Sequence, residues 1–183
     1  LDETLDINGW DLKKALQLLY GSNPTIFEWC ASPVVYLEQE GFSAVRNLLP
    51  QYFSVKKSLF HYWHMAESNY RKYLKEDMVR VKKYLYVLRP LLAAKWVLDR
   101  KTAPPMLFEE LLDAELEEEL RPEVEKLLNL KKTLPEIGLT PKIQRFNDYI
   151  DRSMPIIKGI AEGIYEKKHD WEPLDRVFYE TIR

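Results

Sequence analysis

The chain has 183 residues, of which 27 are Lys or Arg and 29 are Asp or Glu, so that its formal net charge is −2. A nearly neutral chain has no global field that would attract nucleic acid, so any such contact must come from a local patch. No stretch approaches the roughly 20 apolar residues that a membrane span needs. The single cysteine, Cys30, excludes an internal disulfide and is typical of a reducing compartment such as the cytoplasm.

The first residues predict the end of a strand. Leu5-Asp6-Ile7 alternates in polarity, yet no partner strand is predicted in the first third of the chain. We therefore expect residues 1–10 to be the remnant of a larger core that lies upstream, and residues 11–183 to form a helical domain. Asp6 would sit at the end of that strand, where its carboxylate either binds a metal ion or is an ordinary surface or capping group.

Apolar residues at helical spacing predict a mainly α-helical chain. The predicted helices cover residues 11–20, 24–31, 42–49, 55–75, 78–99, 108–120, 122–133, 140–150 and 173–182. Asp11, Asn23 and Ser54 are the expected N-caps. Pro50 is expected to stop the third helix, and Pro90 to lie inside the fifth. The eighth helix has the option of continuing past residue 155 to residue 166, and residues 34–36 are expected to be extended.

One pattern on the predicted helix over residues 55–75 has both a functional and a structural interpretation. His61, His64 and Glu67 recur at a spacing of three, which is compatible with a metal site but also common on a helix that packs. The same helix presents an apolar face, and its members are Leu59, Tyr62, Trp63, Ala66, Tyr70 and Leu74.

Cys30 lies in an apolar helix without a histidine nearby, so we expect a buried, inert thiol.

The fifth helix carries the main candidate site. Lys82, Tyr86 and Arg89 share one helix face, and Lys83 flanks it. Two cations and an aromatic ring on one stripe can bind a phosphate and a base. The alternative is a solvated basic face whose side-chain stems cover apolar surface.

Six segments together suggest a known family, and in chain order they are residues 6–16, 23–24, 28–29, 32–36, 83–94 and 104–111. They resemble a predicted nucleotidyltransferase family associated with bacterial RNA repair, within the DNA polymerase β superfamily. The resemblance implies a Gly-Ser motif, a pair of aspartates and a third carboxylate that together hold two Mg²⁺ ions. The Gly-Ser motif and the aspartate pair are missing here, and Asp6 fits the position of the third carboxylate.

The resemblance therefore implies the C-terminal helical part of an enzyme that transfers a nucleotide from an NTP to an RNA or another hydroxyl acceptor. The fold expected is a helical bundle appended to the last strand of a truncated α/β core. On this interpretation the fragment would be inactive without its catalytic core. The alternative function is a non-catalytic helical module that docks a partner protein, such as an RNA ligase.

Overall fold

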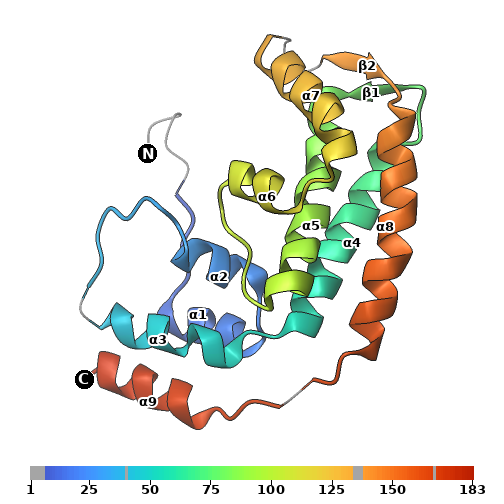
Figure 1. Cartoon of the computed structure of the whole chain (residues 1–183). Coiled ribbons are helices and arrows are strands. Elements are labelled where there is room, and N and C mark those ends of the chain that lie inside the picture. The colour runs from blue at the N-terminus through green and yellow to red at the C-terminus, as the bar shows by residue number, and fades with distance from the viewer. Residues whose placement is uncertain (1–6, 40, 134–137, 167) are drawn as a thin grey trace. The chain divides into compact units, whose positions relative to one another are not determined.

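The computed structural model describes residues 7–39, 41–133, 138–166 and 168–183 (Figure 1). It confirms a mainly helical chain, to which the described residues add two strands of three residues each. Leu5 and Asp6 of the strand end expected there lie outside the described residues, whereas Ile7 is described, is exposed and belongs to no strand. The chain divides into two compact units, which are described separately below: unit 1 comprises Leu1–Phe53 and Lys167–Arg183, and unit 2 comprises Ser54–Glu166.

Unit 1 contains four helices within its described residues. They are α1 (Leu12–Tyr20), α2 (Pro24–Cys30), α3 (Phe42–Tyr52) and α9 (Glu172–Thr181). The Asp11 carboxylate accepts a hydrogen bond from the backbone N–H of Lys14 at 2.8 Å, and Asn23 accepts one from Thr25 at 2.9 Å. Both predicted N-caps are thus confirmed, and the chain enters each helix where a side chain replaces a missing backbone acceptor.

Helix α3 does not stop before Pro50 as expected, because it continues to Tyr52. Proline removes one backbone hydrogen bond, but near a helix end that loss is smaller than in the middle. Burial of Tyr52 offsets it, since its side chain has no exposed surface and its hydroxyl donates to the Asp170 carbonyl at 2.6 Å. The extra turn is therefore stabilised by a residue of the C-terminal segment, which the local sequence could not indicate.

The core of unit 1 joins its first three helices to α9. Its buried apolar residues are Leu16, Leu19, Ile26, Phe27, Val45, Tyr52, Leu174 and Val177. Cys30 is also buried, as predicted, with 7% of its surface exposed. Burial raises the pKa of its thiol, which keeps the sulfur in the unreactive protonated form.

Unit 2 is built on three long helices. They are α4 (Val55–Tyr73), α5 (Val81–Arg100) and α8 (Gln144–Gly163), and α4 packs against both others (Figure 1). The remaining elements are β1 (Met78–Arg80), α6 (Phe108–Glu115), the 3-10 turn η1 (Glu118–Leu120), α7 (Arg121–Thr133) and β2 (Leu139–Pro141). All six residues of the predicted apolar face of α4 are buried. Ser54 caps α4 as predicted, accepting from the Lys57 N–H at 3.2 Å.

The structure corrects two helix starts, because residues 78–80 and 139–141 form an antiparallel pair of strands instead. Val79 faces Thr140 at the centre of the pair, and both are buried. Each strand has only three residues, too few to show a period of two against the neighbouring helical pattern. The backbone hydrogen bonds between these two distant segments replace the helical hydrogen bonds that each segment would otherwise form. The local sequence could not indicate this pairing.

The predicted helix over 108–120 is also shorter than expected, since α6 ends at Glu115 and Leu116 is extended. On either side of this break, Glu115 contacts Arg100 and Glu117 contacts Arg152, the latter at 2.6 Å. Partners on α5 and α8 thus hold the break in place.

By contrast, α8 does continue through Pro155, as the sequence allowed, and Pro90 lies inside α5. Across the described ranges, no helix is long and apolar enough to cross a membrane.

Candidate nucleotide- or RNA-binding surface on α5

The four residues predicted as a binding face lie on the first half of α5, and one of them, Lys83, contacts Tyr73 of α4. Tyr86 is 46% exposed, and Lys82, Lys83 and Arg89 are partly exposed. We call Tyr73, Lys82, Lys83, Tyr86 and Arg89 the α5 cationic surface. Ala93, one turn beyond Arg89, is buried, so the accessible stripe ends there.

Lys83 is held between two aromatic rings. Its ammonium nitrogen lies 3.8 Å from the ring centroid of Tyr73 and 4.5 Å from that of Tyr86. A cation over a ring face is attracted by the ring quadrupole, which limits the freedom of the long lysine side chain. Tyr73 is the last residue of α4, so sequence analysis of the α5 stripe missed it. No local spacing could have linked it to Lys83.

The charge around Tyr73 is positive. A hydrogen bond with Lys72, followed by the charges of Lys72 and Lys83, lowers the pKa of the Tyr73 phenol. Such a shift occurs where nearby cations favour an anion. The same cations would favour a phosphate group at this end of α4 and α5.

Arg89 has no acidic partner among the described residues. Asp113, a carboxylate on α6, lies 3.8 Å from the guanidinium of Arg121. A partly buried guanidinium that lacks a carboxylate keeps its five donors available for an external acceptor.

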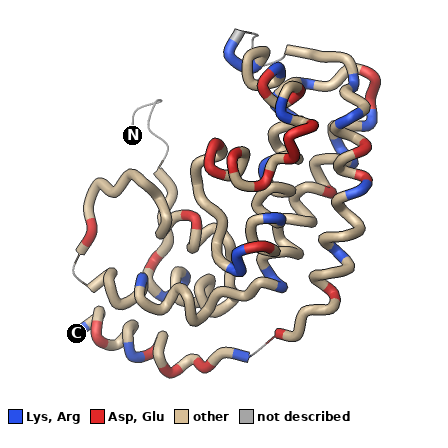
Figure 2. Tube along the Cα trace, in the orientation of Figure 1, with Lys and Arg blue, Asp and Glu red and all other residues tan. Residues whose placement is uncertain are grey.

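The start of α5 carries cations where a helix usually carries acids. Its N-cap residue, Arg80, makes no side-chain capping bond, and the first turn contains Lys82 and Lys83 but no acidic residue. The positive end of the helix dipole disfavours cations there by about 0.3–1 kcal/mol each. In Figure 2, basic and acidic positions are interspersed along the long helices. The starts of α1 and α4 likewise carry two lysines each and no acidic residue, so this pattern by itself does not distinguish α5.

The described residues contain no group of three or more His, Cys, Asp or Glu side chains that could hold a metal ion. Of the candidate trio on α4, Glu67 pairs with Arg71 at 2.7 Å, and the His64 ring packs edge-on against Trp63. The other metal candidate, Asp6, lies outside the described residues. The described part of the chain therefore does not present a ligand set for Mg²⁺.

A comparison with known protein families gives a match over nearly the whole chain. A model of the RNA repair pathway DNA polymerase beta family matches residues 1–180. The chain belongs to this family. The resemblance seen in the sequence is thereby confirmed, and membership in this polymerase-β-like RNA repair family agrees with nucleotidyl transfer in general.

A relative from Bacillus subtilis (strain 168), named as the uncharacterized protein YcgL, is 36% identical over 185 residues. The match covers all of this chain and 71% of the relative. No solved structure matches the chain. The family assignment thus rests on sequence.

Proposed function

We propose that this chain is the C-terminal helical part of a nucleotidyltransferase that transfers a nucleotide from an NTP to an RNA or another hydroxyl acceptor. In this proposal the α5 cationic surface contacts the triphosphate or the RNA backbone. Catalytic residues of a separate α/β core, carrying a Gly-Ser motif and two aspartates, would act beside it. The family membership supports the reaction class, and the electrostatics of α5 support the contact.

The observation that carries the proposal is the partly buried Arg89 guanidinium, for which the described residues supply no carboxylate. Leaving a cation partly desolvated and unpaired costs stability, and a phosphate would supply the missing partner. Lys83, held between Tyr73 and Tyr86, adds a second cation that flanks the helix face carrying Arg89. Arginine can grip two phosphate oxygens at once, while the lysine acts as a point charge.

Asp6 remains our candidate for the third carboxylate of a two-metal site, by its match to the family pattern. A bound Mg²⁺ pair would activate the attacking hydroxyl and neutralise the triphosphate. Since the described residues form no metal site, the remaining ligands would come from the proposed α/β core. Asp6 would be the contribution of this chain.

Arg89→Lys tests the phosphate contact. We expect it to weaken binding of an NTP or a short RNA by about tenfold, because a charge-assisted hydrogen bond is worth about 1.5–3 kcal/mol and lysine loses the second one. Lys83→Ala should weaken binding and also make the dependence of affinity on salt shallower by about one phosphate contact. The measurement is fluorescence anisotropy of a labelled ligand with the full-length protein at two salt concentrations.

Arg152→Lys is the matched control. This arginine of α8 also lies in unit 2, but it pairs with the carboxylate of Glu117. It should leave affinity unchanged. Unchanged affinity in Arg89→Lys, together with a lower midpoint of thermal unfolding, would mean that Arg89 only supports the fold. In that case the α5 cationic surface is a solvated basic face.

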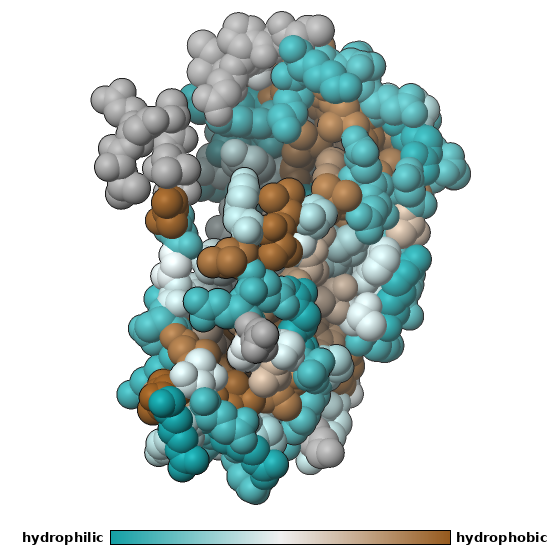
Figure 3. Space-filling model, turned by 90° about the vertical axis from the view of Figure 1, so that its left-hand side faces the viewer, coloured by the Kyte–Doolittle hydropathy of each residue, from teal (hydrophilic) through white to brown (hydrophobic). Residues whose placement is uncertain are grey.

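One observation favours the alternative, a module that docks a partner such as an RNA ligase. In unit 1, the loop between α2 and α3 exposes Val34, Val35 and Leu37 at 59%, 56% and 82%. They line a groove of about 600 Å³ together with Trp29 and Phe42. Figure 3 shows hydrophobic residues at the surface among hydrophilic ones. Monomeric proteins rarely leave such contiguous apolar area uncovered, so this groove is where a protein partner would bind.

A further inference from the structure

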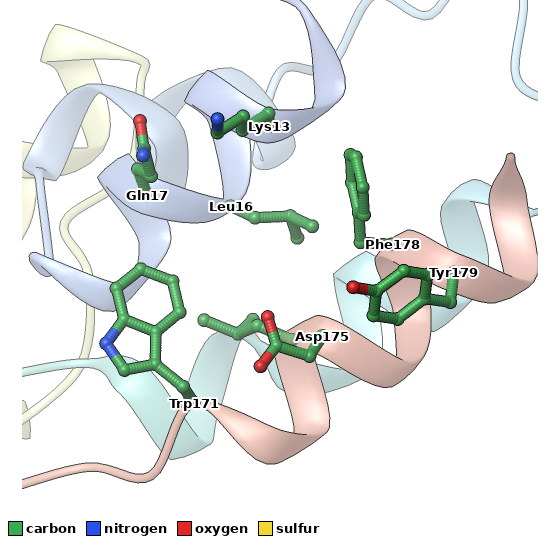
Figure 4. Close-up of a pocket in the computed structure, with 8 residues that line it drawn as sticks. Lys13, Leu16, Gln17, Trp171, Asp175, Phe178 and Tyr179 are labelled. Atoms are coloured by element: carbon green, nitrogen blue, oxygen red, sulfur yellow. The ribbon is translucent and has the colours of Figure 1, made fainter.

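A second cavity lies in unit 1, between α1 and α9, and none of its residues belongs to the α5 cationic surface. It has a volume of about 300 Å³. Its lining residues are Lys13, Leu16, Gln17, Trp171, Leu174, Asp175, Phe178 and Tyr179. In Figure 4 the indole of Trp171 forms one side, Phe178 stands opposite to it, and Leu16 points in from α1. The cavity is thus aromatic at its walls and apolar at its base.

Trp171 is fixed in place before any ligand arrives. Its ring stacks on Tyr20, with centroids 3.8 Å apart and planes inclined by 12°. Tyr20 in turn donates a hydrogen bond to the His169 carbonyl at 3.3 Å. Yet Trp171 remains 39% exposed. A rigid, partly exposed indole offers a stacking platform at little cost in side-chain entropy.

The rim of the cavity carries polar groups of both signs. Lys13 and Gln17 line it from α1, while Asp175 and Tyr179 line it from α9. Neither the Lys13 ammonium nor the Asp175 carboxylate has a hydrogen-bond or ion-pair partner within the described ranges. One acceptor and one cationic donor beside aromatic walls suit a flat ring that bears both donors and acceptors.

We propose that this cavity binds a nucleobase that carries an exocyclic amino group, stacked on Trp171, with Asp175 accepting from the amino group and Lys13 donating to a ring acceptor. The choice of a nucleobase rests on the proposed function, whereas the cavity itself does not. Adenine, cytosine and guanine have such an amino group and uracil does not, so uracil is disfavoured. The base comes either from a free nucleotide or from an unpaired position in RNA.

The carboxylate makes the proposal specific. A negative charge at the rim repels a phosphate backbone, so a site for phosphate would be impaired by Asp175 and improved by its removal. A site for a base needs the carboxylate as an acceptor and loses affinity without it. Replacement of Asp175 by asparagine therefore separates the two kinds of ligand by the sign of the effect.

The test uses 2-aminopurine, a fluorescent base with an exocyclic amino group that loses fluorescence when it stacks. One arm uses its free ribonucleoside triphosphate, and the other uses an RNA hexamer with one 2-aminopurine among uridines. With the full-length protein, we expect quenching in the arm that holds the true source of the base. Trp171→Ala should abolish the quenching, and Asp175→Asn should weaken binding by about tenfold.

Trp171→Phe keeps a stacking ring and should retain most of the binding, which separates loss of stacking from loss of fold. Tyr165→Ala, at a residue of unit 2 that is 91% exposed, is the control and should change nothing. Tighter binding in Asp175→Asn would overturn the proposal. If the RNA arm is the one that is quenched, equal affinity for an all-uridine hexamer used as competitor would overturn it too. Absence of quenching in both arms would also overturn it, while Arg89→Lys would still test the α5 contact independently.

Discussion

At the scale of single residues, Glu115 is unusual because it is a buried acid. Its side chain is 2% exposed and contacts Arg100, while Lys95 donates to its backbone carbonyl at 2.9 Å. Burial, and then the neighbouring carboxylate of Asp99, raise the pKa of Glu115, against the lowering effect of Arg100 and Lys95. The folded protein therefore holds the Glu115 proton more tightly than the unfolded chain does.

This shift predicts a pH dependence of stability. A raised pKa in the folded state stabilises the fold below the ordinary pKa of glutamate, and the stabilisation is lost as the pH rises through the folded-state pKa. Relative to Glu115→Gln, the free energy of unfolding of the wild type should fall over that window by about 1.4 kcal/mol per unit of raised pKa. Urea unfolding at several pH values measures it.

Glu123→Gln is a control of opposite sign, because hydrogen bonding to Arg145 lowers the pKa of Glu123. In that comparison the wild type should gain stability as the pH rises from below the lowered pKa to the ordinary pKa of glutamate. Equal slopes for the two variants would contradict the assignment of burial as the main influence on Glu115.

At the scale of elements, side-chain caps fix where helices begin. Asp11, Asn23 and Ser54 were all predicted from sequence, and each accepts the expected backbone hydrogen bond. Such agreement is possible because a cap and its helix lie within a few residues of each other. Helix α5 starts without a side-chain cap, as do α3, α6, α8 and α9, so caps mark the starts of only some of the described helices.

Ser54→Ala is expected to destabilise unit 2 by about 1 kcal/mol, because the Lys57 N–H loses its acceptor at the start of α4. Ser54→Thr keeps the hydroxyl and should recover most of the loss. The midpoints of chemical unfolding, followed by circular dichroism, compare the two. If threonine is as destabilising as alanine, packing around this buried residue, and not the cap, is what matters.

At the scale of the whole molecule, the chain forms one continuous unit and one discontinuous unit. Unit 2 is a single stretch of sequence, whereas unit 1 needs α9 from the end of the chain to cover its core. Leu174 and Val177 of α9 are 1% and 6% exposed, so their burial is complete only when both parts of unit 1 are present. The two units should therefore respond differently to being cut out of the chain.

We expect the fragment 54–166 to fold and to unfold cooperatively by itself. The fragment 1–53 should show little helix, because it lacks the hydrogen bond from Tyr52 to Asp170 and the stack of Trp171 on Tyr20. Adding a peptide of residues 167–183 should restore helix to it. Far-ultraviolet circular dichroism with thermal melts tests this, and a fully helical 1–53 fragment would show that α9 is dispensable.

The sequence by itself determined the local features of this protein. Helical periodicity placed the apolar face of α4 in the core, cap residues marked helix starts, and a shared helix face gathered Lys82, Tyr86 and Arg89. Segment matches also identified the family, as the comparison with its model confirmed. All of these signals act over a few turns of helix or over an ordered run of residues.

Only the tertiary structure decided which distant segments meet. It paired Val79 with Thr140 where helix starts were predicted, brought Tyr73 of α4 to the Lys83 ammonium, and extended α3 past Pro50. It also formed the cavity between α1 and α9, whose walls come from the two ends of the chain. Burial and pairing across such separations contribute enough free energy to override local preference, and local periodicity carries no record of the partner.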